Sequence, residues 1–296
     1  MKLFSPRTDL ASERMQANTD LRGVSLEKHS DGGIETEVLR VSSAEGARSI
    51  GKPMGIYTTF SFPSPLEMDG DTKRLLSEKI GTSIEKTLLR LSGKSEPNRL
   101  SLIVAGLGNR ALTVDSVGVV TAEKIHATAH IKEEMPELFR SLGAAEICVA
   151  LPGVLSQSGM EAADAIAGLL HSFPADAVLV FDALASRSLS RIGKTVQIAD
   201  SGIEPGSGIG NRRRALSLRT LGVPVVSVGV PTVTDTATLV SDTLAALMGE
   251  SLPDGISKLL TETEKSFVSP DDCDRSTEEI SKLLADAVNL RLGVML

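Results

Sequence analysis

The chain has 296 residues, of which 41% are hydrophobic, and this length is enough for one large domain or two modest ones with a substantial core. The formal net charge of -7 and the aromatic content of 3% argue against a protein that binds DNA or RNA directly, because such proteins need basic surfaces and aromatic stacking platforms. Two cysteines are too few for a disulfide framework, and no run of about 18 apolar residues occurs, so we expect a cytoplasmic protein that spans no membrane.

The first third of the chain contains few strongly patterned segments. Residues 1–30 are polar and rich in turn-forming residues, which predicts a loosely held arm. The residue patterns of 33–41 and 56–62 predict two strands. Residues 71–91 carry apolar side chains at helical spacing and predict an amphipathic helix.

The middle of the chain alternates short apolar strands with helices. Strands are predicted at 100–105, 146–151, 177–181, 196–199 and 223–230. Helices are predicted at 119–131, 159–170 and 235–248, with two more in the charged C-terminal region, at 256–260 and 277–290. Nearly continuous apolar strands between helices indicate a three-layer α/β fold, in which helices cover both faces of a mostly parallel or mixed sheet.

A glycine-rich loop directly follows the strand predicted at 100–105. It reads Gly-Leu-Gly-Asn-Arg-Ala-Leu-Thr-Val-Asp-Ser-Val-Gly over residues 106–118 and would hold Asp115 at the carboxyl edge of the sheet, where α/β proteins place their sites. A phosphate-binding loop and a simple helix cap are the alternatives. The dinucleotide pattern G-x-G-x-x-G is not met, because Ala111 stands where the third glycine would be.

A second acidic residue, Asp182, ends the apolar strand predicted at 177–181. Partial burial there would raise the pKa of its carboxyl. Two carboxyls at neighbouring strand ends can divide the work of hydrolysis, one activating water as a base and the other donating a proton. The alternative is an Asp that caps the next turn and pairs with Arg187 or Arg191.

Further polar segments are weaker candidates. Residues 200–212 are glycine-rich and could cradle an anion or an extended peptide, but they lack the Lys-Ser/Thr ending of a nucleotide-binding P-loop. His126 and His130 are four residues apart on a predicted helix, as metal ligands would be, yet no Glu follows His126 to complete a zinc-protease motif. A structural role is favoured for this pair, and His130 stays a candidate for lining the site.

Several motifs together resemble the germination proteases of spore-forming bacteria. They are Arg-Thr-Asp-Leu-Ala-Ser-Glu at 7–13, the loop from Gly106 to Asp115, Leu-Pro-Gly-Val at 151–154, Asp-Ala-Leu-Ala-Ser-Arg at 182–187, the segment from Gln197 to Asn211, and two short motifs at 221–225 and 229–233. The resemblance covers residues 7 to 235 and rests on their order as well as their content.

This resemblance implies an endopeptidase that degrades small acid-soluble spore proteins during germination, with Asp115 and Asp182 as its catalytic residues and without a metal or cofactor. It implies a fold similar to that of hydrogenase maturation proteases, of the phosphorylase/hydrolase-like type. It also implies a homotetramer in the cytoplasm of the forespore and spore core, with no nucleic acid or membrane partner.

The resemblance further implies a zymogen. Residues 1–9 would be a propeptide arm, and residues 10–296 a single peptidase domain with a helical segment from about residue 250. Residues 8–13 imitate the family's preferred cleavage sequence, which is Thr-Glu, an apolar residue and Ala-Ser-Glu, and this predicts processing between Asp9 and Leu10. The candidates for substrate binding are Gly108, Asn109, His130, Arg187, Gly206, Ser207, Gly208, Asn211 and Arg212.

Three other functions remain open at this stage. The loop from Gly106 to Gly118 also resembles nickel-dependent hydrogenase maturation proteases. The glycine-rich loops would also suit a nucleotide-dependent enzyme, and an inactive protein that binds spore proteins without cutting them is the third possibility.

Overall fold

The computed structural model describes residues 6–15, 22–208, 210, 213–248, 253–262 and 265–293. Within them a sheet of nine strands has the order β1-β2-β3-β7-β8-β6-β4-β5, with β9 paired to β8. The strands are β1 (Val24–Asp31), β2 (Ile34–Val41), β3 (Gly55–Ser61), β4 (Ser101–Gly106), β5 (Glu146–Ala150), β6 (Ala177–Ser186), β7 (Thr195–Ala199), β8 (Val225–Asp235) and β9 (Phe267–Val268). The strands β5, β4, β6 and β8 pair in parallel, and every other pairing is antiparallel.

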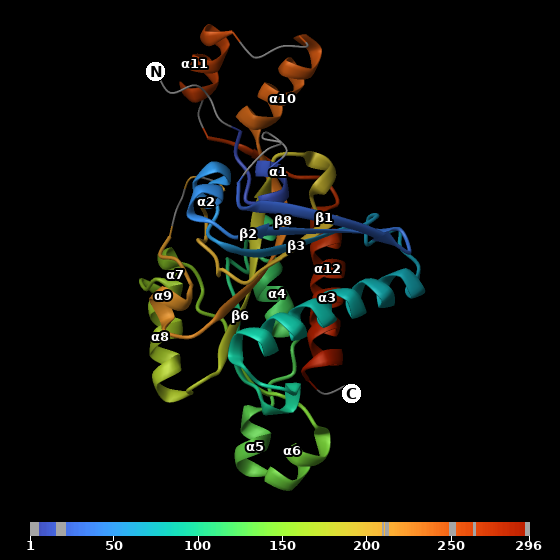
Figure 1. Ribbon diagram of the computed structural model, residues 1–296, viewed down its shortest axis with the longest axis vertical. Coiled ribbons are helices and arrows are strands. Elements are labelled where there is room, and N and C mark those ends of the chain that lie inside the picture. Colours follow the sequence, from blue (N-terminus) through green and yellow to red (C-terminus); the bar gives the residue numbers. More distant parts are fainter. Residues whose placement is uncertain are drawn as a thin grey trace.

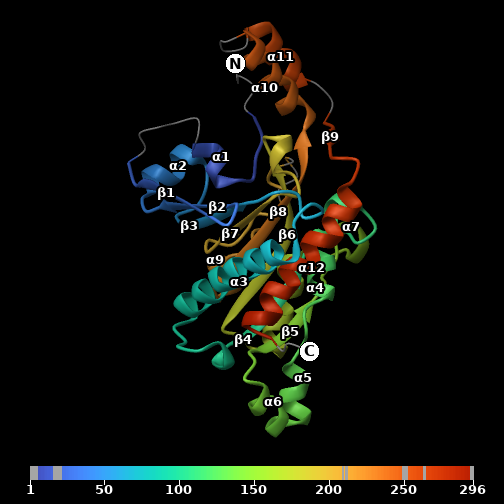
Figure 2. The same cartoon turned by 90° about the vertical axis from the view of Figure 1, so that its right-hand side faces the viewer.

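Helices cover both faces of this sheet, which confirms the predicted α/β fold class (Figures 1 and 2). The α-helices are α1 (Ala11–Met15), α2 (Ala44–Ile50), α3 (Gly70–Ser92), α4 (Val117–Glu123), α5 (Ala129–Glu134), α6 (Pro136–Leu142), α7 (Leu155–Ser158), α8 (Ala162–Ser172), α9 (Leu218–Leu221), α10 (Thr236–Met248), α11 (Asp254–Glu262) and α12 (Cys273–Arg291). On one face α3, α4 and α12 bury the main core, and on the other face α8 and the pair α1–α2 bury two smaller clusters.

The helix α3 shows how local sequence sets an element. Asp69 precedes it and its side chain accepts a hydrogen bond from the Thr72 amide at 2.8 Å, while Gly93 ends it in the left-handed conformation. Between them Leu76, Ile80, Ile84 and Leu88 are fully buried at four-residue spacing. The helix predicted at 71–91 is therefore confirmed.

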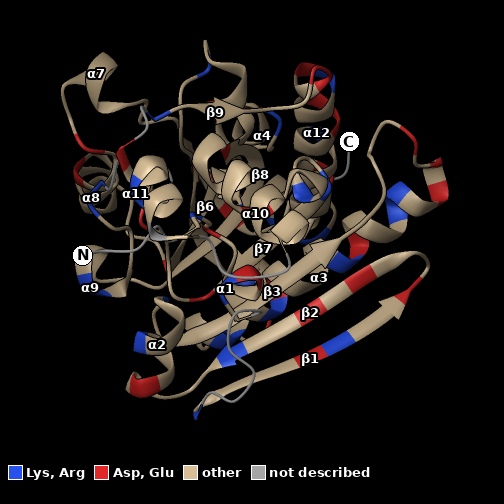
Figure 3. Cartoon of the chain, turned by 90° about the horizontal axis from the view of Figure 1, so that it is seen from above, with Lys and Arg blue, Asp and Glu red and all other residues tan. Residues whose placement is uncertain are grey.

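Two helical hairpins project from opposite ends of the molecule. The pair α5–α6 lies at the end where the parallel strands begin, and α10–α11 lies at the end where β6 and β8 finish (Figure 1). Seen from above, α10 and α11 stand over those strand ends, and the outer ribbon β1–β2 carries both acidic and basic residues (Figure 3). No helix in the described part of the chain is long and apolar enough to cross a membrane.

The structure corrects three of the predicted elements. The helix predicted at 119–131 stops at Glu123, because the Thr128 hydroxyl accepts from the Ile147 amide at 2.8 Å and donates to the Ala145 carbonyl at 2.6 Å, which turns the chain toward β5. The strand predicted at 177–181 continues to Ser186, so Asp182 lies inside β6. The predicted loose arm is wrong for residues 8–13, which are buried, and for 24–30, which belong to β1.

Candidate active site

Asp182 is a deeply buried acidic residue of the candidate site. It lies on β6 with 5% of its surface exposed. Burial raises the pKa of its carboxyl well above the ordinary value, and the nearby carboxylates of Asp115 and Asp9 raise it further. The carboxyl is therefore held toward its protonated form, which can donate a proton or a hydrogen bond.

Asp115 is held by a compact loop. The Asn109 amide donates to both the main-chain carbonyl and Oδ2 of Asp115, each at 3.0 Å, and the Asp115 amide donates to the Leu112 carbonyl at 2.8 Å. Burial raises the pKa of this half-buried carboxyl, and the Asn109 amide opposes that shift. Asp115 is thus easier to ionise than Asp182.

Close backbone packing brings the two aspartates together. The Leu107 amide donates to the Phe181 carbonyl at 2.9 Å, so the loop starts beside the residue that precedes Asp182. Gly118, in the first turn of α4, lies against the same Phe181 carbonyl and has no room for a Cβ. The loop that carries Asp115 is therefore fixed against β6.

Asp115 and Asp182 line one cavity of about 480 Å³. Its other lining residues are mainly apolar and include Leu107, Leu112, Val114, Val154, Leu155, Ala183, Leu184, Val233 and Phe267, with Arg213 and Arg214 also present. In the described part of the chain, no three His, Cys, Asp or Glu side chains converge in a way that could hold a metal ion.

The N-terminal arm lies in this site, with Asp9 at its centre. The Asp9 amide donates to the Ala185 carbonyl at 2.8 Å, and its carboxylate accepts from the Ala185 amide at 2.9 Å and from the Ser207 hydroxyl at 2.7 Å. Gly208 lies so close to this carboxylate that a Cβ there would collide with it. Asp9 also lines the cavity of the two catalytic candidates.

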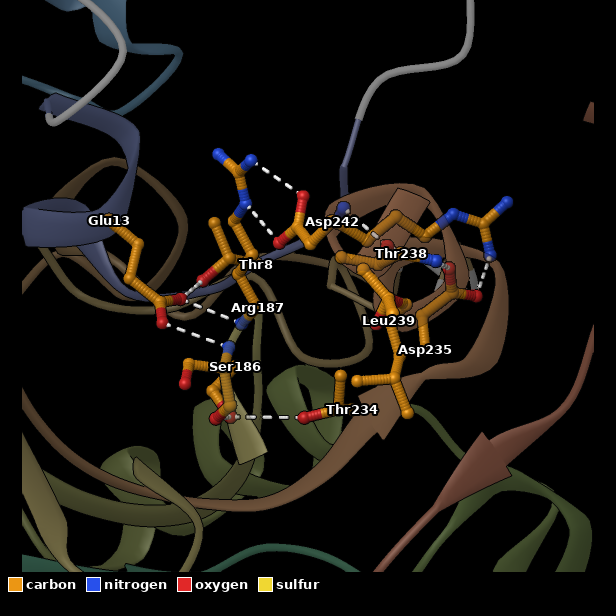
Figure 4. Close-up of polar contacts among 12 residues, drawn as sticks. Thr8, Glu13, Ser186, Arg187, Thr234, Asp235, Thr238, Leu239 and Asp242 are labelled. Carbon is orange, nitrogen blue, oxygen red and sulfur yellow. Dashed lines mark hydrogen bonds and ion pairs between the residues drawn. The ribbon is translucent and has the colours of Figure 1, made fainter. Parts of the chain in front are cut away.

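Glu13, four residues after Asp9, is bound at a second carboxylate-binding position (Figure 4). The amides of Arg187 and Ser188 donate to it at 2.8 and 3.2 Å, the Thr8 hydroxyl also donates to it, and the guanidinium of Arg191 lies 3.5 Å away. Between Asp9 and Glu13, the residues Leu10, Ala11 and Ser12 are buried. A peptide segment of six residues is therefore bound along its length by the rest of the chain.

Most of the predicted site residues gather around this segment. Gly108, Asn109 and Gly206 line the cavity. The Ser207 hydroxyl donates to the Asp9 carboxylate, and Gly208 packs against the same carboxylate. Asn211 and Arg212 lie outside the described residues. Asp9 and Leu10, the residues of the predicted processing site, are 7% and 0% exposed.

Two of the predicted substrate-binding side chains lie elsewhere. The Arg187 guanidinium makes two hydrogen bonds of 2.6 Å to Asp242 on α10, and the Arg187 amide donates to Glu13 of the bound segment (Figure 4). His130 is exposed on α5, at the opposite end of the sheet, because the chain leaves α4 before reaching it. Neither residue lines the cavity of the two aspartates.

Two contacts of the bound segment were not among the predicted site residues. Gln197 on β7 contacts the main chain on both sides of Leu10, and Arg191 lies between Glu13 and Glu37. A long polar side chain within a short strand that is otherwise apolar, as in Val-Gln-Ile-Ala, was the available signal for Gln197. No local pattern marks Arg191.

Comparison with known proteins decides the family. A family model described as Germination protease matches residues 7–267. The chain belongs to the germination protease family. A germination protease of Clostridium tetani (strain Massachusetts / E88) is 34% identical over 98% of this chain and 96% of its own length. One from Caldanaerobacter subterraneus subsp. tengcongensis is 37% identical over 82% of this chain and 74% of its own length.

The chain is therefore related to proteases. The range that the germination protease model matches contains both aspartates and the bound segment. Among solved structures, the NiFe hydrogenase maturation protease HycI from Thermococcus kodakarensis KOD1 matches 64% of this chain and 93% of its own, at 17% identity and a TM-score of 0.31. That similarity is too low to support an argument about function.

Proposed function

We propose that this chain is an endopeptidase in which Asp115 and Asp182 together activate a water molecule. The observation that carries the proposal is the single cavity lined by both carboxyls and by a bound acidic peptide segment of the same chain. The apolar lining limits water around the carboxyls, which strengthens the electrostatic interactions inside the cavity.

The two environments support a division of roles. Asp182, held toward its neutral form, would donate to the carbonyl oxygen of the scissile bond and later to the leaving nitrogen. Asp115, the more readily ionised of the two, would take a proton from the attacking water. Because the carboxyls interact, they titrate as a pair. The two roles apply to the form of the pair that carries one proton between the two carboxyls.

The bound arm supports an acidic substrate sequence and self-processing. The donors that bind Asp9 and Glu13 favour two carboxylates four residues apart, with small or apolar residues between them. We propose that the arm is cut between Asp9 and Leu10, and that small acid-soluble spore proteins are the substrates in trans. A homotetramer in the spore cytoplasm remains part of the proposal.

The test is cleavage of a peptide that carries Thr-Glu-Phe-Ala-Ser-Glu, together with mass spectrometry of the chain itself. Wild type should cut the peptide after its first Glu and lose residues 1–9. Asp115→Asn and Asp182→Asn should each lower both rates by about 10³-fold or more, because each removes one proton-transfer group.

Asp31→Asn is the matched control, since Asp31 is exposed and forms an ion pair with Lys79 on the surface. It should cleave at the wild-type rate. Full activity in either Asp115→Asn or Asp182→Asn would remove that residue from the mechanism.

A further inference from the structure

Gln197 is bound to the arm on both sides of Leu10. The Ala11 amide donates to its side-chain oxygen Oε1 at 2.7 Å, and its side-chain nitrogen Nε2 donates to the Asp9 carbonyl at 3.4 Å. The Asp9 carbonyl belongs to the peptide bond that joins Asp9 to Leu10. One amide side chain therefore brackets the bond at which processing is proposed.

The chemistry of the two main-chain groups sets the orientation of this side chain. The Ala11 amide is a donor only, so the nearer atom of the Gln197 amide must be the oxygen. The nitrogen then faces the Asp9 carbonyl, which is an acceptor only. Reversing the side chain would place two donors together and two acceptors together, which would leave all four groups unpaired.

The position of Gln197 is set by the sheet rather than by a loop. The strand β7 pairs with β8 at Gly229 and with β3 at Thr59, and Gln197 has 7% of its surface exposed. The side chain of Leu184 on β6 packs against the bare Gly229 backbone beside it. Gln197 therefore presents a preorganised donor to the carbonyl without needing to move.

We propose that Gln197 is a catalytic residue that positions the Asp9–Leu10 bond and stabilises the oxyanion formed there; this rests on the proposed function. The water oxygen bonds to the Asp9 carbonyl carbon and gives its proton to one carboxylate, and the carbonyl oxygen gains negative charge. That oxygen accepts from Nε2 of Gln197. The C–N bond then breaks, and the Leu10 nitrogen takes its proton from the other carboxyl.

The geometry favours this role over simple substrate binding. A separation of 3.4 Å is long for a neutral carbonyl, and a donor of this kind gains strength when the oxygen becomes charged and approaches it. The amide is also uncharged, so it adds no charge beside the Asp9 carbonyl. Removing one such donor typically costs about 10²-fold in rate.

Two substitutions separate the two contacts. Gln197→Ala removes both the donor and the acceptor. Gln197→Glu keeps an acceptor for the Ala11 amide, and it loses the donor once the new carboxyl ionises. Thr195→Val is the matched control on the same strand, because the buried Thr195 hydroxyl has no hydrogen-bond partner among the described residues.

Two measurements on the full chain test the proposal. Mass spectrometry gives the rate at which residues 1–9 are lost between about pH 5 and about pH 9. Hydrogen exchange reports on the Ala11 amide. Gln197→Ala should slow processing by about 10²-fold at every pH and speed Ala11 exchange. Gln197→Glu should keep Ala11 protected and show a deficit that grows as pH rises. Thr195→Val should match wild type in both measurements.

A structural role alone would not produce a deficit that depends on pH in one variant only. Wild-type processing in Gln197→Glu at high pH would overturn the oxyanion role, and unchanged Ala11 exchange in Gln197→Ala would overturn the bracketing of Leu10. If wild type never loses residues 1–9, the proposed self-processing fails and the oxyanion role with it, while the exchange measurement still decides the positioning role.

Discussion

The two aspartates of the candidate site are held by different kinds of structure. Asp182 lies within a ten-residue strand and pairs with Gly229 on β8, so the sheet fixes its main chain. Asp115 ends a short 3₁₀ turn in a loop, and local hydrogen bonds from Asn109 and to Leu112 fix it. The difference separates two properties: β6 supplies a buried environment, and the loop supplies a position that its own hydrogen bonds fix.

Substitutions in the loop should therefore disable Asp115 and leave Asp182 untouched, and Gly108→Ala is the strongest of these. Gly108 has φ = 105°, and a Cβ there would collide with the Asp115 carbonyl. We expect cleavage to fall by about 10²-fold as the Asp115 carboxyl is displaced, and the free energy of unfolding to fall by about 1–3 kcal/mol. Peptide cleavage and urea unfolding measure the two effects.

Gly93→Ala is the control that separates strain from displacement. Gly93 also has a positive φ, of 72°, but a Cβ there meets nothing within 4 Å. It should lower the free energy of unfolding through backbone strain alone and leave cleavage unchanged. Equal cleavage in Gly108→Ala and wild type would show that the loop does not position a catalytic group.

The burial of Asp182 should be visible as a dependence of stability on pH. Its pKa is raised in the folded chain, so the folded state binds more protons than the unfolded state between the ordinary value of 3.8 and the raised one. The free energy of unfolding therefore falls as pH rises through this window, and the loss is complete above the raised pKa. Asp182→Asn has no proton to lose and should escape that loss.

We accordingly expect Asp182→Asn to be more stable than wild type above the raised pKa of Asp182, because the wild-type carboxyl must ionise there in a buried position. The difference should shrink on acidification toward pH 3.8. Urea unfolding across this range measures it, and Asp115→Asn should show the same trend more weakly because Asp115 is only half buried. A destabilised Asp182→Asn at high pH would mean that the carboxylate is charged and well paired.

Local sequence was sufficient to predict the elements that carry the two aspartates, but not their exact limits. The apolar run at 177–181 identified β6, and the glycines at 106 and 108 identified the loop after β4. The strand continues past Asp182 because β8 pairs with it as far as Ser186, and no local pattern contains that partner. Likewise, β7 was predicted as a strand, while its antiparallel direction follows from pairing with β3 and β8.

The errors in the predicted site have one physical origin, which is competition from distant groups. Arg187 was assigned to substrate, yet Asp242, 55 residues further along the chain, binds its guanidinium. His130 was placed on a continuous helix, yet Thr128 finds main-chain partners at Ala145, just before β5, and at Ile147 on β5. The arm looked loose because its residues are polar, and they are buried because β6 and the loop after β7 supply donors for their carboxylates.

The smallest expected effect concerns the contact that ties the Asp115 loop to the sheet. The Thr232 hydroxyl on β8 donates to the Val114 carbonyl at 2.6 Å, one residue before Asp115. Thr232→Val keeps the shape and removes this bond, which should cost about 1 kcal/mol and slow cleavage by about fivefold. Thr87→Val removes a comparable hydroxyl bond of 2.7 Å within α3, far from the loop, and should leave cleavage unchanged. If both variants cleave alike, the Asp115 loop holds its position without β8, and its local hydrogen bonds are sufficient.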